Sequence, residues 1–274
     1  MQVPTSQACT TKLLGVEISA GWSAPAELAE PPAELRARAK AVDAVSATEL
    51  DLAVLWQELV CGACEVIDYF FTDERCLLLT KPRVAPGRAI EGRRLAIVQA
   101  VLCGGGQKAV AIELGLAAST ITMHARLALS ALGVDGKPSR AHPILMLAAR
   151  SAADASAALG ANLSFIEQSG GQLRVLSLSR PDAALGGVLP PAELAVARRL
   201  VEGHCYADMA RMRGTSARTI ANQIAAVFKR MRVSGRNELV HRLWRRRAAA
   251  GVPSRANVRY LTRVQGVSRG LSLG

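Results

Sequence analysis

The chain repeats itself at a fixed offset of 99 residues, and this repeat constrains its fold more than any other feature. Residues 75–134 align with residues 174–233 without a gap. Glycines, prolines and leucines coincide in this alignment, for example Gly115 with Gly214. Matches across such different residue types indicate a duplicated fold rather than two alanine-rich helices of similar composition. The sequence therefore predicts two copies of one structural unit.

Positive charge is concentrated in the second copy. The repeat divides the 274-residue chain into residues 1–48, 49–147, 148–247 and 248–274, and the two middle segments are each long enough for a core of their own. The first module, 49–147, is neutral, whereas the second module, 148–247, carries +9 of the net charge of +12. Such an imbalance is typical of a protein that binds a polyanion, above all nucleic acid.

The two ends of the chain lack the pattern of a packed domain. Residues 20–40 are rich in Ala, Glu and Pro without an apolar period. We expect 1–48 to be a disordered leader with one short helix near Ala33–Ala44, and 248–274 to be a disordered basic tail. The chain has neither a run of roughly 20 apolar residues nor a signal peptide's charged start. We therefore expect a cytoplasmic, bacterial protein that does not enter a membrane.

Each module begins with a helix and a β-hairpin. The apolar residues of Leu52–Val60 recur at helical spacing and predict an amphipathic helix. Two runs of β-forming residues follow, Glu65–Phe71 and Cys76–Thr80, and their counterparts in the second module are Leu163–Glu167 and Leu173–Ser179. A hairpin alone is marginally stable in water, so each hairpin should pack on its neighbouring helices.

A helix-turn-helix follows each hairpin. In the second module a helix stops at Gly203, a short helix spans Tyr206–Met212 and ends at Gly214, and Ser216 is placed to cap a third helix. A helix, a tight turn with glycine and a capped helix make a helix-turn-helix. The predicted fold is mainly α, with two tandem modules that each contain a helix, a β-hairpin and a four-helix helix-turn-helix domain.

The third helix of the second module has two distinct faces. One face is apolar and should lie in the core: Ile220, Ile224, Val227, Phe228 and Met231. The other face combines cations with small residues and one amide: Arg218, Ala221, Asn222, Ala225, Lys229 and Arg232. Cations suit phosphates, and an Asn amide pairs bidentately with adenine in the major groove. On an isolated helix such a stripe is commonly just a solvated face, but its place after a capped turn in a basic module favours DNA binding.

The stretch from Leu189 to Arg236 resembles the C-terminal DNA-binding domain of LuxR/NarL-type transcriptional regulators. The residues that carry this resemblance are Pro191, Glu193, Val196, Leu200, Gly203, Met209, Ala210, Gly214, Ser216, Arg218, Thr219, Ile220, Lys229, Met231, Val233 and Arg236. The resemblance implies a four-helix domain whose third helix enters the major groove. The family usually has Lys in place of Ala221, His in place of Gln223 and an apolar residue in place of Arg213.

The resemblance and the charged face together predict the DNA-binding residues. By position, the resemblance implies base contacts from Ala221, Asn222 and Ala225, and phosphate contacts around Thr219. The complete predicted set in the second module is Ser216, Arg218, Thr219, Ala221, Asn222, Ala225, Lys229 and Arg236.

The first module resembles the same domain but has fewer cations. Ala117 replaces the capping serine, which costs roughly 1 kcal/mol. The outward face of its third helix consists of Ser119, Thr122, Met123, Arg126, Ser130 and Gly133. We expect this module to fold well and to bind phosphate weakly, either as an assisting DNA module or as an assembly surface. Its weaker candidate contacts are Thr120, Thr122, Met123 and Arg126.

No pattern in the sequence indicates catalysis. Cys61 and Cys64 form a lone Cys-x-x-Cys, which a redox pair or half a zinc site could explain, but small apolar residues at a helix-to-strand junction are the simpler interpretation. The segment Cys103–Lys108 lacks the spacing of a phosphate-binding loop. We therefore predict no enzyme activity, no cofactor and no metal site.

The sequence thus predicts an intracellular transcriptional regulator whose second module reads double-stranded DNA. Helix-turn-helix proteins commonly reach two half-sites about one helical turn apart as dimers. A homodimer and an intramolecular pseudo-dimer of the two modules would both meet this need. Two rival functions remain open, a protein-interaction adaptor and a sigma-like factor, and both would have RNA polymerase as the partner.

Overall fold

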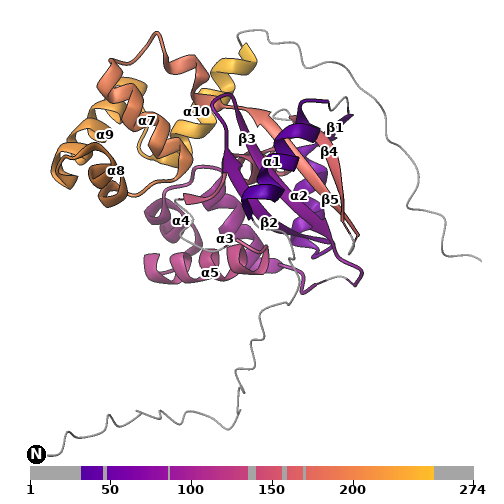
Figure 1. The fold of residues 1–274 in the computed structure, drawn as a ribbon. Helices are drawn as coiled ribbons and strands as arrows, with labels where there is room; N and C mark the ends of the chain where they lie inside the picture. The colour runs from indigo at the N-terminus through magenta and orange to yellow at the C-terminus, as the bar shows by residue number, and fades with distance from the viewer. Residues whose placement is uncertain are drawn as a thin grey trace, which may run out of the picture.

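The computed structural model describes residues 32–45, 48–85, 87–134, 140–155, 159–168 and 171–249 (Figure 1). The predicted tail and most of the predicted leader lie outside these residues. The elements in chain order are α1 (Pro32–Asp43), β1 (Thr48–Asp51), α2 (Leu52–Val60), β2 (Cys64–Phe71), β3 (Arg75–Pro82), α3 (Gly92–Leu102), α4 (Gln107–Leu114), α5 (Ala118–Ala131), α6 (Pro143–Ala153), β4 (Gly160–Gln168), β5 (Gly171–Ser179), the 3-10 helix η3 (Pro181–Leu185), α7 (Pro191–Glu202), α8 (Tyr206–Arg213), α9 (Ala217–Met231) and α10 (Arg236–Ala249).

Both hairpins belong to one five-stranded antiparallel sheet, in the order β1-β4-β5-β3-β2. The predicted hairpins are confirmed as β2–β3 and β4–β5. The prediction of a mainly α fold is met only in part, because β3 pairs with β5 and joins the two hairpins edge to edge in one sheet. A lone hairpin has two unpaired edges and is marginally stable, so this pairing removes one exposed edge from each hairpin. The fold is mixed α and β.

The register of β3 and β5 relates the two hairpins by an approximate two-fold axis. Leu77 lies opposite Ser177, and Leu78 lies opposite Leu176. Because Leu77 and Leu176 are also equivalent positions of the 99-residue repeat, the axis passes between these two cross-strand pairs. The repeats therefore meet as two equivalent halves, through an antiparallel pairing of their central strands.

Helices cover both faces of the sheet. Along β3, successive side chains point to opposite faces. Leu77 and Leu79 pack with Leu35 and Ala39 of α1, whereas Leu78 lies in the larger core that includes α2 and α6. The predicted short helix near Ala33–Ala44 is confirmed, but the leader to which we assigned it is part of the fold in this region. Among its described residues, α1 buries only Leu35 and Ala39. The sequence does not reveal such a narrow buried side, because alanine is common on any face of a helix.

Helix α6 crosses the expected boundary between residues 147 and 148. It packs against α2 and α3 of the first module and against α10 of the second. Residues 143–149 of this helix are buried on every side. A helix that is apolar all round is typical of a shared core, so α6 contributes to the packing of both copies.

The two helix trios, α3–α5 and α7–α9, have equivalent turns. Helix α4 ends at Gly115 with φ +62°, and α8 ends at Gly214 with φ +60°. A left-handed residue at this position closes the helix, and glycine adopts it without steric cost. The turn of each predicted helix-turn-helix is therefore present, at positions exactly one repeat length apart in the sequence.

Candidate nucleic-acid interface

Helix α9 is capped as its sequence predicts. The Ser216 hydroxyl accepts a hydrogen bond from the backbone N–H of Thr219, with an O···N distance of 3.0 Å. The buried side of the helix contains Ile220, Ile224, Val227 and Met231. Phe228 was expected on this side, but it is only half-buried and lies at the margin of the core. The core stripe is therefore narrower than the apolar composition of the helix suggests.

The opposite side of α9 carries most of the predicted DNA-binding residues. Arg218, Thr219, Asn222, Ala225 and Lys229 are exposed along with the cap, and Ala221 is half-buried. Among the described residues, no carboxylate lies within ion-pair distance of Arg218 or Lys229. Both cations are therefore available to an external anion.

Arg236 does not belong to this surface, and its predicted DNA contact is wrong. Its side chain is buried, and its Nε and Nη2 donate to the carbonyl oxygens of Leu200 and Val201, each at 2.7 Å. Burial lowers the pKa of this guanidinium to about 10. Arg236 thus caps the C-terminus of α7, where the last carbonyls have no partners within the helix. Arginine can either cap a helix end or bind a phosphate. The sequence alone therefore did not distinguish these two roles for Arg236.

Helix α8 lies before the turn and adds one cation that sequence reasoning missed. The sulfur of Cys205 accepts a hydrogen bond from the backbone N–H of Asp208 and so caps α8. Arg211 is 80% exposed in its side chain and pairs with Asp208. Hydrogen bonds from Cys205 and Arg211 lower the pKa of Asp208. A comparison of the two repeats could have identified Arg211, because the equivalent position in the first module is the apolar Ile112.

Arg213, where the resembling family has an apolar residue, does not disturb the core. Its side chain is exposed, and its Nη1 donates to the carbonyl oxygen of Ala192 at 3.0 Å. This bond joins the end of α8 to the first turn of α7.

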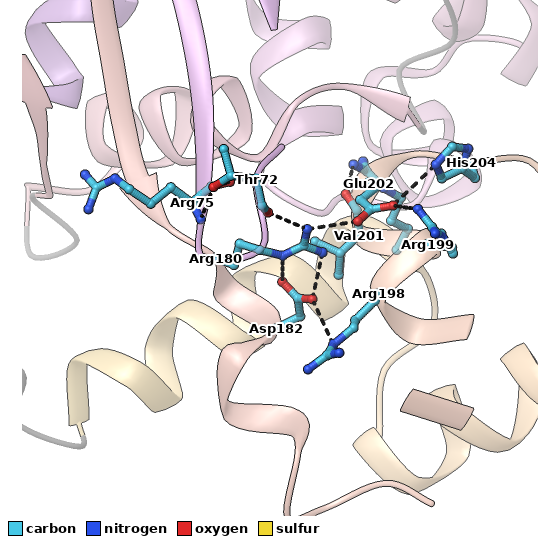
Figure 2. Close-up of polar contacts among 10 residues, drawn as sticks. Thr72, Arg75, Arg180, Asp182, Arg198, Arg199, Val201, Glu202 and His204 are labelled. Carbon is cyan, nitrogen blue, oxygen red and sulfur yellow. Dashed lines mark hydrogen bonds and ion pairs between the residues drawn. The ribbon is translucent and has the colours of Figure 1, made fainter. Parts of the chain in front are cut away.

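A buried ion-pair network joins α7 to the sheet (Figure 2). The guanidinium of Arg180, just after β5, donates to both carboxylate oxygens of Asp182, at 3.0 and 2.9 Å. It also donates to Glu202 Oε1, at the end of α7, at 2.9 Å. A fourth bond, of 3.0 Å, goes to the backbone carbonyl of Thr72 in the turn of the first hairpin. One side chain therefore ties both hairpins to the helix-turn-helix of the second module.

Charge on both partners maintains this network. Burial raises the pKa of Glu202, but hydrogen bonds from Arg180 and Arg199 outweigh burial and leave the pKa below its usual value. Burial lowers the pKa of Arg180, and its bonds to Asp182 and Glu202 more than reverse this effect. Separating buried charges leaves each one uncompensated in a medium that solvates it poorly. The network therefore fixes α7, and with it α9, relative to the sheet.

Helix α10 holds the two helix trios together. Asn237 Nδ2 donates to the carbonyl of Val101 at 2.9 Å, and His241 Nε2 lies 2.7 Å from the carbonyl oxygen of Leu102. Val101 and Leu102 are the repeat partners of Leu200 and Val201, the residues that Arg236 caps. The first turns of α10 thus satisfy equivalent carbonyls at the ends of α3 and α7. This double capping gives α5 and α9 a fixed relative orientation.

The outward face of α5 differs from that of α9. The N-cap residue Ala117 makes no side-chain cap, as predicted. Thr122 donates its hydroxyl to the carbonyl of Ala118 at 2.9 Å and lies 3.3 Å from Gln107 Oε1, so part of its polar capacity is used within the module. Met123 and Arg126 are exposed, and Thr120 is half-buried. This face therefore presents one cation and an exposed thioether.

The Cys-x-x-Cys motif lies at the junction of α2 and β2, with Cys61 at the C-cap of the helix and Cys64 at the start of the strand. The cysteines of the Cys-x-x-Cys motif are both free thiols, and burial raises the pKa of Cys64 to about 11, which opposes thiolate chemistry. Within the described ranges, no three potential ligands cluster in a way that could hold a metal ion. None of the described helices has the length and apolar character that crossing a bilayer requires.

Comparison of the chain with models of known families, with curated proteins and with solved structures found no match.

Proposed function

We propose that the chain is a transcriptional regulator that binds duplex DNA through α9. Arg218, Asn222, Ala225 and Lys229 follow the spacing i, i+4, i+7 and i+11, so they form one stripe along the exposed side of the helix. The two cations stand about 16 Å apart along the helix axis. The major groove is about 12 Å wide. A cation at each end of the stripe can therefore reach the phosphates that border the groove.

The middle of the stripe suits contact with bases. Asn222 lies between the two cations and offers both a donor and an acceptor, the pair that adenine presents in the major groove. Ala221 and Ala225 have small side chains that allow the helix backbone to approach the base edges. At protein–DNA interfaces, contacts to phosphates usually position the protein and contacts to bases select the sequence. The charged ends of the stripe suit the first role, and the central amide suits the second.

The observation that carries this proposal is the pair of exposed, unpaired cations at the two ends of the stripe. A solvated helix face commonly pairs its cations with neighbouring carboxylates, as Arg211 does with Asp208 on α8. The excess of +9 in the second module adds a longer-range attraction for a polyanion.

Binding of the full-length chain to labelled duplex DNA, measured by fluorescence anisotropy over a range of salt concentrations, tests the proposal. We expect log K to fall linearly with log salt, by about 0.9 for each phosphate that is neutralised. The double variant Arg218→Ala/Lys229→Ala should reduce that slope by about two phosphate contacts. Lys108→Ala, an exposed lysine of the first module, is the matched control and should leave the slope unchanged. Absence of binding at about 50 mM salt would contradict the proposal.

A further inference from the structure

An open cavity lies against the second helix trio, on the residues that join its helices. Its volume is about 450 Å³, within the usual range of small-molecule sites, about 300–1,000 Å³. Its lining comes from the end of α7, the start of α8, the end of α9, the start of α10 and the segment before α6. The cavity is therefore large enough for a molecule with one or two rings. The side chains that give it its chemical character are Arg140, His204, Tyr206, Phe228 and Arg236.

Two of these side chains are arginines without a counter-charge. Arg236 is only 7% exposed, and its Nη1 donates to the sulfur of Met146, a weak acceptor, at 3.5 Å. Arg140 is exposed, and its backbone packs against Gly203, where a Cβ would lie 3.1 Å from the Arg140 carbonyl oxygen. Among the described residues, no carboxylate forms an ion pair with either arginine. A buried guanidinium without a counter-charge is costly, and an anion in the cavity would compensate for it.

The carboxylates nearest in sequence are engaged elsewhere. Glu202 is bound within the Arg180 network (Figure 2). Asp208 pairs with Arg211. Glu238 accepts hydrogen bonds from the backbone N–H and the hydroxyl of Ser234, at 2.7 and 2.8 Å. None of these three carboxylates lines the cavity, so its described lining carries positive charge without negative charge.

Aromatic side chains form another part of the wall. Phe228 is half-buried, and Tyr206 is 43% exposed. Both line the cavity, so the apolar surface that they leave open faces the space a ligand would fill. An inorganic anion would not cover this surface, whereas a ring would remove it from water. The lining therefore suits an anion with an aromatic body.

The equivalent place in the first module lacks this chemistry. Gly105 stands where the second module has His204. Leu129 is fully buried at the position equivalent to Phe228, which is half-buried. The packing that the two helix trios share does not account for these differences. The cavity lining is therefore particular to the second module.

We propose that the cavity binds a small aromatic carboxylate. The two arginines bind its carboxylate group, and the ring packs against Phe228 and Tyr206. Nε and Nη2 of Arg236 already donate to the end of α7, so the donors that remain suit the two oxygens of a carboxylate better than the three of a phosphate. The stripe of candidate DNA contacts along α9 does not line the cavity, so this site does not depend on DNA binding.

Isothermal titration calorimetry of the full-length chain with naphthoate, in the absence of DNA, tests the proposal. We expect a dissociation constant of about 1 mM or below, which is usual for a ligand of this size. Naphthamide has the same rings without the charge, and it should bind at least about tenfold more weakly because charge-assisted hydrogen bonds are lost. Acetate has the carboxylate without the rings, and it should also bind at least about tenfold more weakly because it buries little apolar surface.

Three variants locate the site. Arg140→Gln removes an exposed cation and should weaken naphthoate binding about tenfold while leaving naphthamide binding unchanged. Tyr206→Ala removes part of the aromatic wall and should weaken binding of both compounds. Arg245→Gln is the matched control, since Arg245 is exposed on α10 and does not line the cavity, and it should bind naphthoate like the unaltered chain. Circular dichroism shows whether each variant keeps its fold.

Three outcomes would overturn the proposal. Absence of naphthoate binding at about 10 mM would show that the cavity is not a site for this class of ligand. Equally tight binding of naphthamide or acetate would show that the site does not select an aromatic anion. Normal naphthoate binding by folded Arg140→Gln or Tyr206→Ala would place the ligand elsewhere on this basic chain. Because these measurements contain no DNA, their failure is separate from failure of the proposed DNA binding.

Discussion

His142 and His241 stand 99 residues apart, at equivalent positions of the two repeats, and both imidazoles are buried. The ring of His142 lies beside those of Tyr69 and Phe71, with centroid distances of 5.4 and 4.9 Å, and burial lowers its pKa to about 3. Burial also lowers the pKa of His241, although its bond to the carbonyl of Leu102 acts in the opposite direction. The folded chain therefore holds both histidines in the neutral form.

Acid should destabilise the fold through these two histidines. In the unfolded chain they take up protons below a pH of about 6.5, whereas in the folded chain they do so only at lower pH. The free energy of unfolding should therefore fall as the pH drops from about 6.5 to 5, by up to about 2.7 kcal/mol per pH unit for two protons. Urea unfolding at several pH values measures this slope. His142→Asn keeps a capping acceptor for α6 and should lose about half of it. A slope of zero in the unaltered chain would contradict the prediction.

The Arg180 network should contribute strongly to stability. Arg180→Met leaves the buried carboxylate of Asp182 with only the more distant Arg198, at 3.8 Å, among the described cations, and leaves Glu202 with Arg199. We expect a loss of about 3–5 kcal/mol in the free energy of unfolding, mainly through Asp182. The same substitution at Arg230, whose pair with Glu193 is exposed, is the control and should cost less than about 1 kcal/mol. Chemical denaturation compares the two. Equal losses would show that the network contributes no more than a surface ion pair.

The two modules should not fold independently. A fragment of residues 148–247 lacks β3, so β5 would present an unpaired edge, and the apolar side chains that face α2 would be exposed. We expect this fragment to show no cooperative unfolding transition by circular dichroism. Fragments 32–155 and 159–249, each unable to complete the sheet alone, should associate when mixed and recover the transition. A sigmoidal transition of the isolated second module at the midpoint of the full chain would refute this expectation.

Local patterns in the sequence were sufficient to predict the helices, the hairpins and the turns. A serine cap such as Ser216 and a left-handed glycine such as Gly214 act on groups within four residues, so the sequence alone specifies them. The exposed face of α9 follows in the same way from the spacing of its polar residues. For this reason most of the candidate DNA-binding residues were found where they were expected.

Long-range relationships were not predictable in this way. The continuous apolar run of β3 shows that this strand is buried on both faces, but not that β5 is its neighbour. Arg236 illustrates the same limit for a single residue, because its capped carbonyls lie 35 and 36 residues earlier in the chain. A cation in a basic helix-turn-helix fits a phosphate contact equally well when only its local sequence is considered.

Asn222 should determine sequence preference without affecting general affinity. Asn222→Ala removes the candidate base-reading amide and leaves the charge of α9 unchanged, so we expect the preference at one base pair to weaken by roughly 1–3 kcal/mol. Selection of bound sites from randomised duplexes, carried out with the full-length chain and the variant, measures this change. Affinity for unrelated DNA and its dependence on salt should remain as in the unaltered chain.

Arg218→Ala provides the contrasting case for this selection. It removes a candidate phosphate contact at one end of the same stripe, so it should weaken binding to all sequences alike and reduce the salt slope by about one phosphate contact. The selected sequence should stay the same in this variant. If instead Arg218→Ala alters the selected sequence and Asn222→Ala does not, α9 lies in the groove in a different orientation from the one proposed. If neither variant changes binding, the DNA-binding surface is not the exposed face of α9.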